Sequence, residues 1–247
     1  MSQSYADCFL KVERANQHIQ SIQQRISRLE DSFSVVIETD PESGRRFLKY
    51  DLTDKVAGKD IGMLIGDTLH NLKCALDYAW LRTLERHAPS AITSKTQFPA
   101  YAAEEFFEAA LKKAKIDTSC PALCSLMLTQ MMSYAAGSNS AIWALKELNI
   151  LDKHRLLLPL IGYTSITDLQ MEDETGEAVP GFAAGTFQLP PWYIHIPDGW
   201  RVKVKGKPAI SILFDEGTPT PHLDAASHLE MFSVIVKHII QTLEAFA

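Results

Sequence analysis

The spacing of apolar residues predicts long amphipathic helices at both ends of the chain. Over residues 3–30 the apolar positions recur every three or four residues, the period of one helical face; they are Phe9, Val12, Ile19, Ile22, Ile26 and Leu29. The same period returns over about 221–246, at Leu229, Val234, Ile235, Ile239 and Leu243. Both segments are therefore expected to bury one side.

Further helices are expected between these two. One should run from about residue 55 to 86 and stop before Pro89, because a proline disfavours helix in the residue before it. Shorter helices are predicted at about 102–114 and 121–133. After the break AAGSNS, Asn139 or Ser140 can cap a helix that continues through AIWALKELNILDKHR to residue 155.

Two regions have the texture of strands. FSVVIET and RRFLKYDL flank the turn-forming DPESG, which predicts a β-hairpin at about 33–52. Residues 156–216 contain the β-like segments LLLPLIGY, SITDLQM, GTFQL, WYIHI, RVKVK and AISILFDE. The expected fold is α+β: a long-helix bundle with an N-terminal β-hairpin and a C-terminal antiparallel sheet before the last helix. We expect a single domain over 1–247, helical at about 1–155 and 221–247 and β-rich at about 33–52 and 156–216.

Composition narrows the class of protein. The chain has 247 residues, of which 46% are hydrophobic, as expected for an ordered globular protein. Lys and Arg number 24 against 30 Asp and Glu, a net charge of −6, so bulk electrostatic binding to nucleic acid is not expected. The cysteines lack a CxxC pair and are predicted to be free thiols in a reducing cytoplasm. The sequence has neither the pattern of a signal peptide nor a membrane-spanning apolar run.

The segment GDTLHNLKCALDYAW, residues 66–80, carries the strongest chemical signal. Ile65, Leu69, Leu72, Leu76 and Ala79 share one side of the expected helix, and the other side carries Asp67, His70, Asn71, Cys74, Asp77 and Tyr78. A solvated helix face normally uses Lys, Glu, Arg and Gln. The short and ring-bearing groups here fit either a binding or proton-transfer site or a polar seam between helices, in which every group is satisfied internally.

A second polar group is expected at the end of the helix that contains DKHR. Leu145, Leu148, Asp152 and Arg155 follow one another at steps of three and four, so Asp152 is predicted to be buried or half-buried and paired with Arg155. Lys153 should face water, and His154 should follow the side of Trp143 and Ile150. We expect Asp67, His70 or Asn71 to come within reach of Asp152, His154 or Arg155, forming a polar pocket.

Other candidates give weaker signals. His222, Asp224 and His228 resemble a metal half-site, but they also suit the cap and first turn of the last helix. His195 alternates with Tyr193 along a strand and is expected on its face. The sequence contains no GxGxxG, P-loop or GxSxG motif, and no cofactor or metal is predicted.

The two helices resemble those of a group of uncharacterised bacterial proteins. Their pattern GDxLHNLRSALDHLAW, then FP, LQPY and LWxLxxLNNIDKHRLLL, is similar here to GDTLHNLKCALDYAW, QFPA, LTQMMSY and AIWALKELNILDKHRLLLP, over roughly residues 60–160. The RSALDH segment of that group also resembles the RxxxxH motif of HEPN helical-bundle ribonucleases. That resemblance implies an arginine and a histidine acting on RNA, but here Lys73 and Tyr78 occupy the two positions, and a tyrosine is a poor general base at neutral pH.

Three hypotheses follow. The leading one is a cytoplasmic bacterial protein with a HEPN-like bundle that binds a small polar or phosphorylated ligand. The sequence is compatible with either a monomer or a homodimer. The ligand-binding residues would be Asp67, His70, Asn71, Lys73, Asp77, Tyr78, Asp152, His154 and Arg155. The second is a hydrolase or ribonuclease, with or without a divalent metal, built from Asp67, His70, Asp77, Asp152 and His154. The third is a structural or interaction protein of a defence or toxin–antitoxin system.

Overall fold

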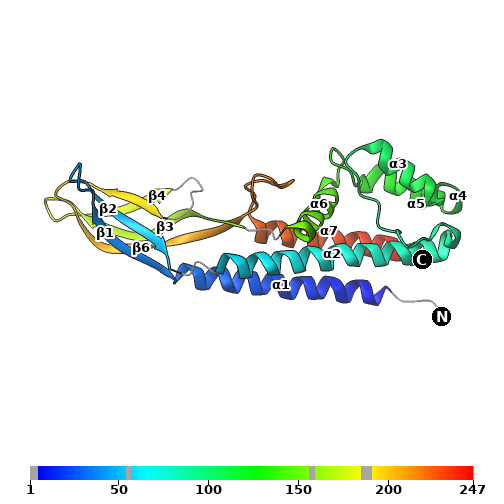
Figure 1. Ribbon diagram of the computed structural model, residues 1–247, viewed down its shortest axis with the longest axis horizontal. Helices are drawn as coiled ribbons and strands as arrows, with labels where there is room; N and C mark the ends of the chain where they lie inside the picture. The colour runs from blue at the N-terminus through cyan, green and yellow to red at the C-terminus, as the bar shows by residue number, and fades with distance from the viewer. Residues whose placement is uncertain (1–4, 54–56, 156–158, 185–190, 247) are drawn as a thin grey trace.

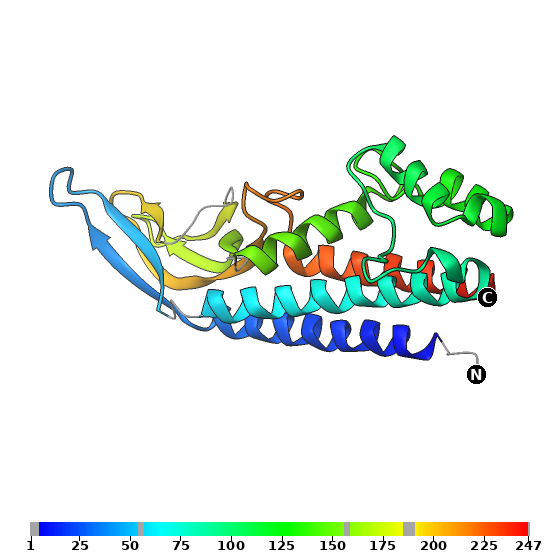
Figure 2. The same ribbon diagram turned by 45° about the vertical axis from the view of Figure 1, so that its right-hand side comes forward.

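The computed structural model describes residues 5–53, 57–155, 159–184 and 191–246. The molecule is elongated, with helices at one end and strands at the other (Figures 1 and 2). The helices are α1 (Ala6–Glu30), α2 (Ala57–His87), α3 (Glu104–Lys113), α4 (Ile116–Ser119), α5 (Pro121–Leu126), α6 (Ser140–His154) and α7 (Ala225–Ala245), with short turns η1 (Pro89–Ala91) and η2 (Met127–Met131). The strands are β1 (Phe33–Thr39), β2 (Arg46–Leu52), β3 (Leu160–Glu172), β4 (Ala178–Ala184), β5 (Trp192–Ile196) and β6 (Arg201–Leu213).

The helical core forms where α1, α2 and α7 lie side by side (Figure 1). The expected apolar face of α2 is confirmed, because Leu69, Leu72 and Leu76 are fully buried. The side chain of Asp224 accepts a hydrogen bond from the backbone N–H of Ser227 at 2.8 Å, so this residue begins α7 as an N-cap.

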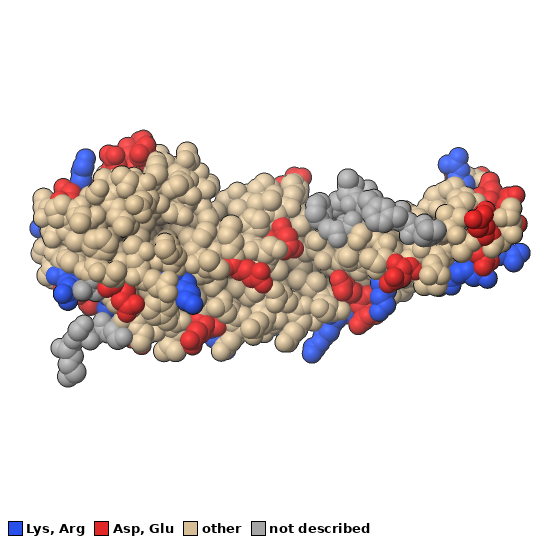
Figure 3. All heavy atoms as spheres, turned by 180° about the vertical axis from the view of Figure 1, so that it is seen from behind, with Lys and Arg blue, Asp and Glu red and all other residues tan. Residues whose placement is uncertain are grey.

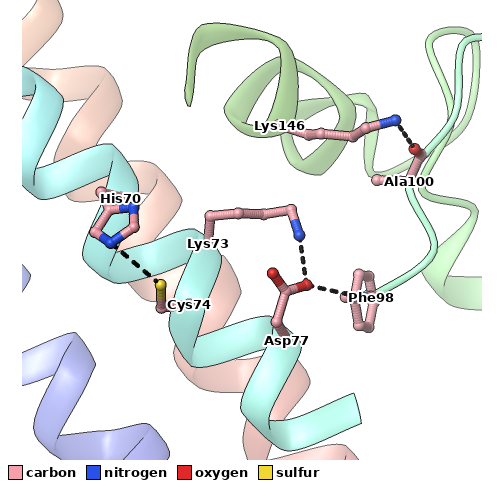
Figure 4. A network of polar contacts seen from close by, with 7 residues as sticks. All are labelled: His70, Lys73, Cys74, Asp77, Phe98, Ala100 and Lys146. Atoms are coloured by element: carbon pink, nitrogen blue, oxygen red, sulfur yellow. Dashed lines mark hydrogen bonds and ion pairs between the residues drawn. The ribbon is translucent and has the colours of Figure 1, made fainter. Parts of the chain in front are cut away.

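Helix α6 and a lobe formed by α3, α4 and α5 complete the helical part. In Figure 2 the lobe stands away from the α1–α2 pair, and the segment that follows η1 connects it to α2. An isolated β-bridge between Tyr101 and Tyr134 joins the beginning of the lobe to the segment that precedes α6. Residues 98–101 consequently lie beside both α2 and α6 (Figure 4).

The strands form two three-stranded sheets, in the orders β1-β2-β5 and β4-β3-β6. The predicted hairpin is present, with Phe33 opposite Leu52 and Thr39 opposite Arg46. It also pairs with β5, so the hairpin and the C-terminal strands are not separate. The two sheets enclose a second hydrophobic cluster of Leu48, Tyr50, Ile166, Leu169, Met171, Trp192 and Ile196.

The strand predictions differ from the structure in their lengths. LIGY and SITDLQM belong to one strand, β3, and RVKVK joins AISIL in β6. Gly206 lies within β6 at φ +73°, a conformation that glycine adopts without strain, and the pairing of β6 with β3 keeps its register on both sides of it, from Ser165–Ala209 to Gln170–Val204. The strand β4 was not predicted, and GTFQL lies outside the described residues.

The expected fold class is confirmed: a helix bundle, an N-terminal hairpin, C-terminal antiparallel strands and a final helix. Phe33 packs against both hydrophobic clusters and so joins the helical part to the β part. The single domain over 1–247 stays a prediction. Among the described helices, none combines the length and the apolar character needed to cross a membrane.

Candidate functional site

The polar side of α2 divides into three surroundings. Asp67, His70 and Tyr78 are exposed, Tyr78 to 42%. Asn71 and Lys73 are buried, at 9% and 5% exposed, and Cys74 and Asp77 are half-buried. The predicted polar side is therefore real, but its members do not share one environment.

Lys73 and Asp77 form a partly buried ion pair one turn apart on α2 (Figure 4). The Lys73 ammonium donates to Oδ1 of Asp77, which also accepts a hydrogen bond from the backbone N–H of Phe98 at 2.8 Å. Burial lowers the pKa of Lys73, while the attraction of Asp77 opposes that shift. Asp77 thus holds the segment at Phe98 against α2, and the same carboxylate pairs with the buried ammonium of Lys73.

Lys146 of α6 holds the same segment from the other side. Its ammonium donates to the carbonyl oxygen of Ala100 at 2.8 Å and lies 5.0 Å from the centre of the Tyr101 ring. Sequence reasoning missed Lys146, although the FP pair in QFPA had marked the segment that it binds. Asn149, buried at 4% exposed, was missed as well; an amide among the leucines of this helix was the available signal.

Asn71 and Asp67 face toward α1. Asn71 donates to the backbone carbonyl of Asp67 at 2.8 Å, and its Oδ1 lies 3.4 Å from the ammonium of Lys11. His18 of α1 has a lowered pKa because of burial and the nearby Arg14, and the negative charge of Asp67 acts against this shift. Helix α1 therefore supplies polar partners that were not predicted.

His70 and Cys74 form a pair one turn apart on the outer side of α2. The Sγ atom lies 3.5 Å from Nε2 of His70 (Figure 4). Burial is the largest influence on the pKa of Cys74 and raises it, as does Asp77. The ammonium groups of Lys11, Lys73 and Lys153 act in the opposite direction. The net shift is upward, so the thiol is protonated at neutral pH and is not an activated nucleophile.

Helix α6 meets α2 at Gly66. A Cβ atom on residue 66 would lie 2.6 Å from the carboxyl carbon of Asp152, so only a glycine allows this close approach. Asp152 is half-buried as predicted, whereas Lys153 and His154 are exposed.

The predicted pair between Asp152 and Arg155 is wrong. Helix α6 ends at His154, and Arg155 has an extended backbone at φ −153° and ψ 137°. The helical spacing of three residues therefore no longer places the two side chains on one face. The exposed guanidinium of Arg155 donates to the carbonyl oxygen of Gly217 at 3.4 Å instead.

The predicted polar pocket between the two helices stays a prediction. Helices α2 and α6 do meet, but the hydrogen bonds of His70 and Asn71 stay within α2 and α1. Two cavities lie elsewhere. One borders α7 and η2, and the other borders residues 91–101 and α3; the predicted site residues line neither.

The residues that gave weaker signals contact neighbouring parts of the protein. Asp224 caps α7, and Nδ1 of His228 lies 2.9 Å from the carbonyl oxygen of Asp224. His222 is exposed, 3.7 Å from Glu216. His195 lies on the outer face of β5 beside Phe47, with 5.5 Å between ring centres. Within the described residues, no three His, Cys, Asp or Glu side chains gather as a metal site.

These observations define an α+β protein whose helical part carries an exposed imidazole next to a half-buried thiol, and a buried lysine paired with a half-buried aspartate. Comparison with known proteins adds no family: no protein-family model, curated protein or solved structure matches the chain.

Proposed function

We propose that the protein binds a small phosphorylated ligand on the outer side of α2, at a site that we call the His70 surface: Lys11, His70, Asn71, Cys74 and Lys153. The observation that supports it is the pair of exposed His70 and half-buried Cys74, with lysines from α1 and α6 close enough to act on the thiol. A phosphate accepts hydrogen bonds, and ammonium and imidazole groups can donate them.

The contacts of Asn71 support the same site. Its amide oxygen takes one hydrogen bond from the Lys11 ammonium at 3.4 Å, and an ammonium has three donors. Lys11 is thus held at the edge of the site with donors left for an anion. Lys153 is exposed and lies at the end of α6.

Binding is better supported than catalysis. The Cys74 thiol has a raised pKa, and the described residues include no candidate metal cluster. In the ribonuclease alternative, the residues at positions 73 and 78 would act together. Here Lys73 is buried against Asp77 while Tyr78 is exposed, so their surroundings differ.

The resemblance of the α2 and α6 segments to bacterial proteins supports a finer version of the proposal, a HEPN-like bundle in a bacterial cytoplasm. The ribonuclease alternative has its own test: Lys73→Arg together with Tyr78→His would restore the motif and, under that alternative, would produce RNA cleavage. A structural or interaction protein would show neither cleavage nor phosphate binding.

Isothermal titration with pyrophosphate tests the proposal. We expect pyrophosphate to bind, and its affinity to fall as salt rises from about 0.05 to 0.5 M. His70→Ala or Lys153→Ala should each lower the affinity by about fivefold, which is roughly 1 kcal/mol at an exposed site. The matched control is Lys113→Ala, an exposed lysine at the cavity beside α3. Equal affinity in all variants, or a loss only in Lys113→Ala, contradicts the His70 surface.

A further inference from the structure

A cavity lies on another part of the helical bundle, between α7 and the segment from Leu126 to Asn139. Its volume is about 380 Å³, within the range of small-molecule sites. Helix α7 lies behind α2 in Figure 1, and Figure 3 views the molecule from that side. Charged side chains are sparse over the middle of the helical part in this view (Figure 3).

One wall of the cavity has an unusual backbone. Residues Met127–Met131 form a π-helical turn, closed by a hydrogen bond from the N–H of Met132 to the carbonyl oxygen of Met127 at 2.9 Å. Met132 has φ +27°, and Gly137 lies so close to it that a Cβ atom would be 2.9 Å from the Met132 carbonyl carbon. Such π turns and strained residues occur often at functional sites.

Polar groups are fixed at the same wall. Ser138 Oγ and Asn139 Nδ2 both donate to the backbone carbonyl of Gln130, at 3.2 and 3.1 Å. Within the described part of the chain, Oδ1 of Asn139 and the imidazole of His238 make no hydrogen bond to protein. Both side chains line the cavity and can bond a ligand.

The rest of the lining is uncharged and, apart from Gln130 and Thr242, apolar. Met131 and Ile239 are buried beneath the cavity, and Val234 at its rim is 70% exposed. The lining includes no Lys, Arg, Asp or Glu, so a charged ligand would lose hydration without gaining an ion pair. Covering Val234 and the apolar floor would remove hydrophobic surface from water.

We infer that this cavity binds a small uncharged amphipathic molecule. Its aliphatic body packs on Met131, Ile239 and Val234, and its hydroxyl or amide group bonds Asn139 or His238. A single molecule of this size fits the volume, whereas a second copy of the chain would need a far larger contact area. This inference does not depend on the phosphate site.

A series of straight-chain alcohols from 1-hexanol to 1-decanol tests the inference, with NMR of the ¹⁵N-labelled full chain. We expect the amides of residues 126–131 and 234–242 to shift. Affinity should rise about fourfold per methylene and then stop rising when the cavity is full. Octanoate and octylammonium should bind at least tenfold more weakly than 1-octanol.

The discriminating variant is Val234→Asp, which places a charge at the rim and should weaken 1-octanol binding at least tenfold. The matched control is Met231→Asp. Met231 is also exposed on α7, about one turn earlier, and does not line the cavity, so its substitution should leave the affinity within twofold. Circular dichroism verifies that both variants fold.

Three results would overturn the inference: no amide shifts at these residues, equal weakening in both variants, or charged compounds binding as tightly as 1-octanol. A dimer seen by sedimentation, dissociated by Val234→Asp and insensitive to alcohols, would show instead that the face joins two copies of the chain.

Discussion

Gly66 of α2 lies directly against the carboxylate of Asp152 of α6, so that a Cβ atom at position 66 would be 2.6 Å from the carboxyl carbon. Helices α2 and α6 approach closely at this contact, one turn before His70 on α2 and one residue before Lys153 on α6. The geometry of the proposed phosphate site depends on it.

The Gly66 contact predicts opposite effects for two glycine substitutions in the same helix. At Gly58 a Cβ atom would meet only Ile161, at 3.5 Å, so Gly58→Ala should stabilise by about 0.5–1 kcal/mol. Gly66→Ala should be about 1–3 kcal/mol less stable than Gly58→Ala because it overpacks the contact. Urea unfolding measures both.

A double substitution isolates the cause. In an Asp152→Ala background the overlap is gone, and Gly66→Ala should then increase the free energy of unfolding, as Gly58→Ala does. If Gly66→Ala is already stabilising when Asp152 is present, the two helices are not in the described contact.

The buried pair of Lys73 and Asp77 predicts unequal losses. Asp77→Ala leaves the Lys73 charge without its carboxylate and removes the acceptor for the Phe98 N–H; this should cost about 3 kcal/mol, the lower end for a broken buried pair because Asp77 is half-exposed. Lys73→Met keeps the bond to Phe98 and should cost less than about 1.5 kcal/mol. Equal losses in chemical denaturation would contradict this account.

Burial of Cys8 predicts a loss of stability at alkaline pH. The thiol is fully buried in α1, and burial raises its pKa from 9.0 to about 11. The unfolded chain releases this proton first, so the stabilising effect is complete below pH 9 and is lost as pH rises toward 11. The loss should reach about 2–3 kcal/mol.

Cys8→Ala supplies the control, because other groups also titrate in this range. The difference in unfolding free energy between wild type and Cys8→Ala should shrink from pH 8.5 to pH 11. A constant difference would mean that Cys8 ionises equally in both states.

The core face of α2 predicts a large cavity effect. Leu69 is fully buried, and Leu69→Ala should cost about 2–5 kcal/mol. Met63, in the same helix and 53% exposed, is the matched control; Met63→Ala should cost less than about 1 kcal/mol. Thermal melts that show similar shifts for both would place the wrong face in the core.

The sequence was sufficient for the helices and for the apolar face of α2, since a period of 3.6 residues is a local property. The buried line through Leu145 and Leu148 also extends to Asp152. The helical spacing does not extend to Arg155, because the helix ends one residue earlier. The period of apolar residues does not indicate the backbone geometry at which a helix ends.

The site was predicted less well because its partners come from distant parts of the chain. Lys73 was expected to bind a ligand, but it is buried and donates to Asp77, which also accepts from the backbone N–H of Phe98. Lys11 was not expected at all, although it reaches Asn71 across 60 residues of sequence. Likewise, nothing local to β2 indicates that it pairs with β5.

The most direct test of the phosphate site uses the chain's own cysteines. Cys74 and Cys120 are both half-buried, and only Cys74 belongs to the His70 surface. Their alkylation by iodoacetamide is followed by mass spectrometry of the full chain, with and without pyrophosphate.

We predict that pyrophosphate slows the modification of Cys74 by at least about threefold, since a bound anion covers the thiol and disfavours the thiolate. The rate at Cys120 should not change. If pyrophosphate at concentrations up to 10 mM, roughly 1–10 times the dissociation constant of a weak site, leaves the Cys74 rate unchanged or slows both cysteines equally, the proposed site is contradicted.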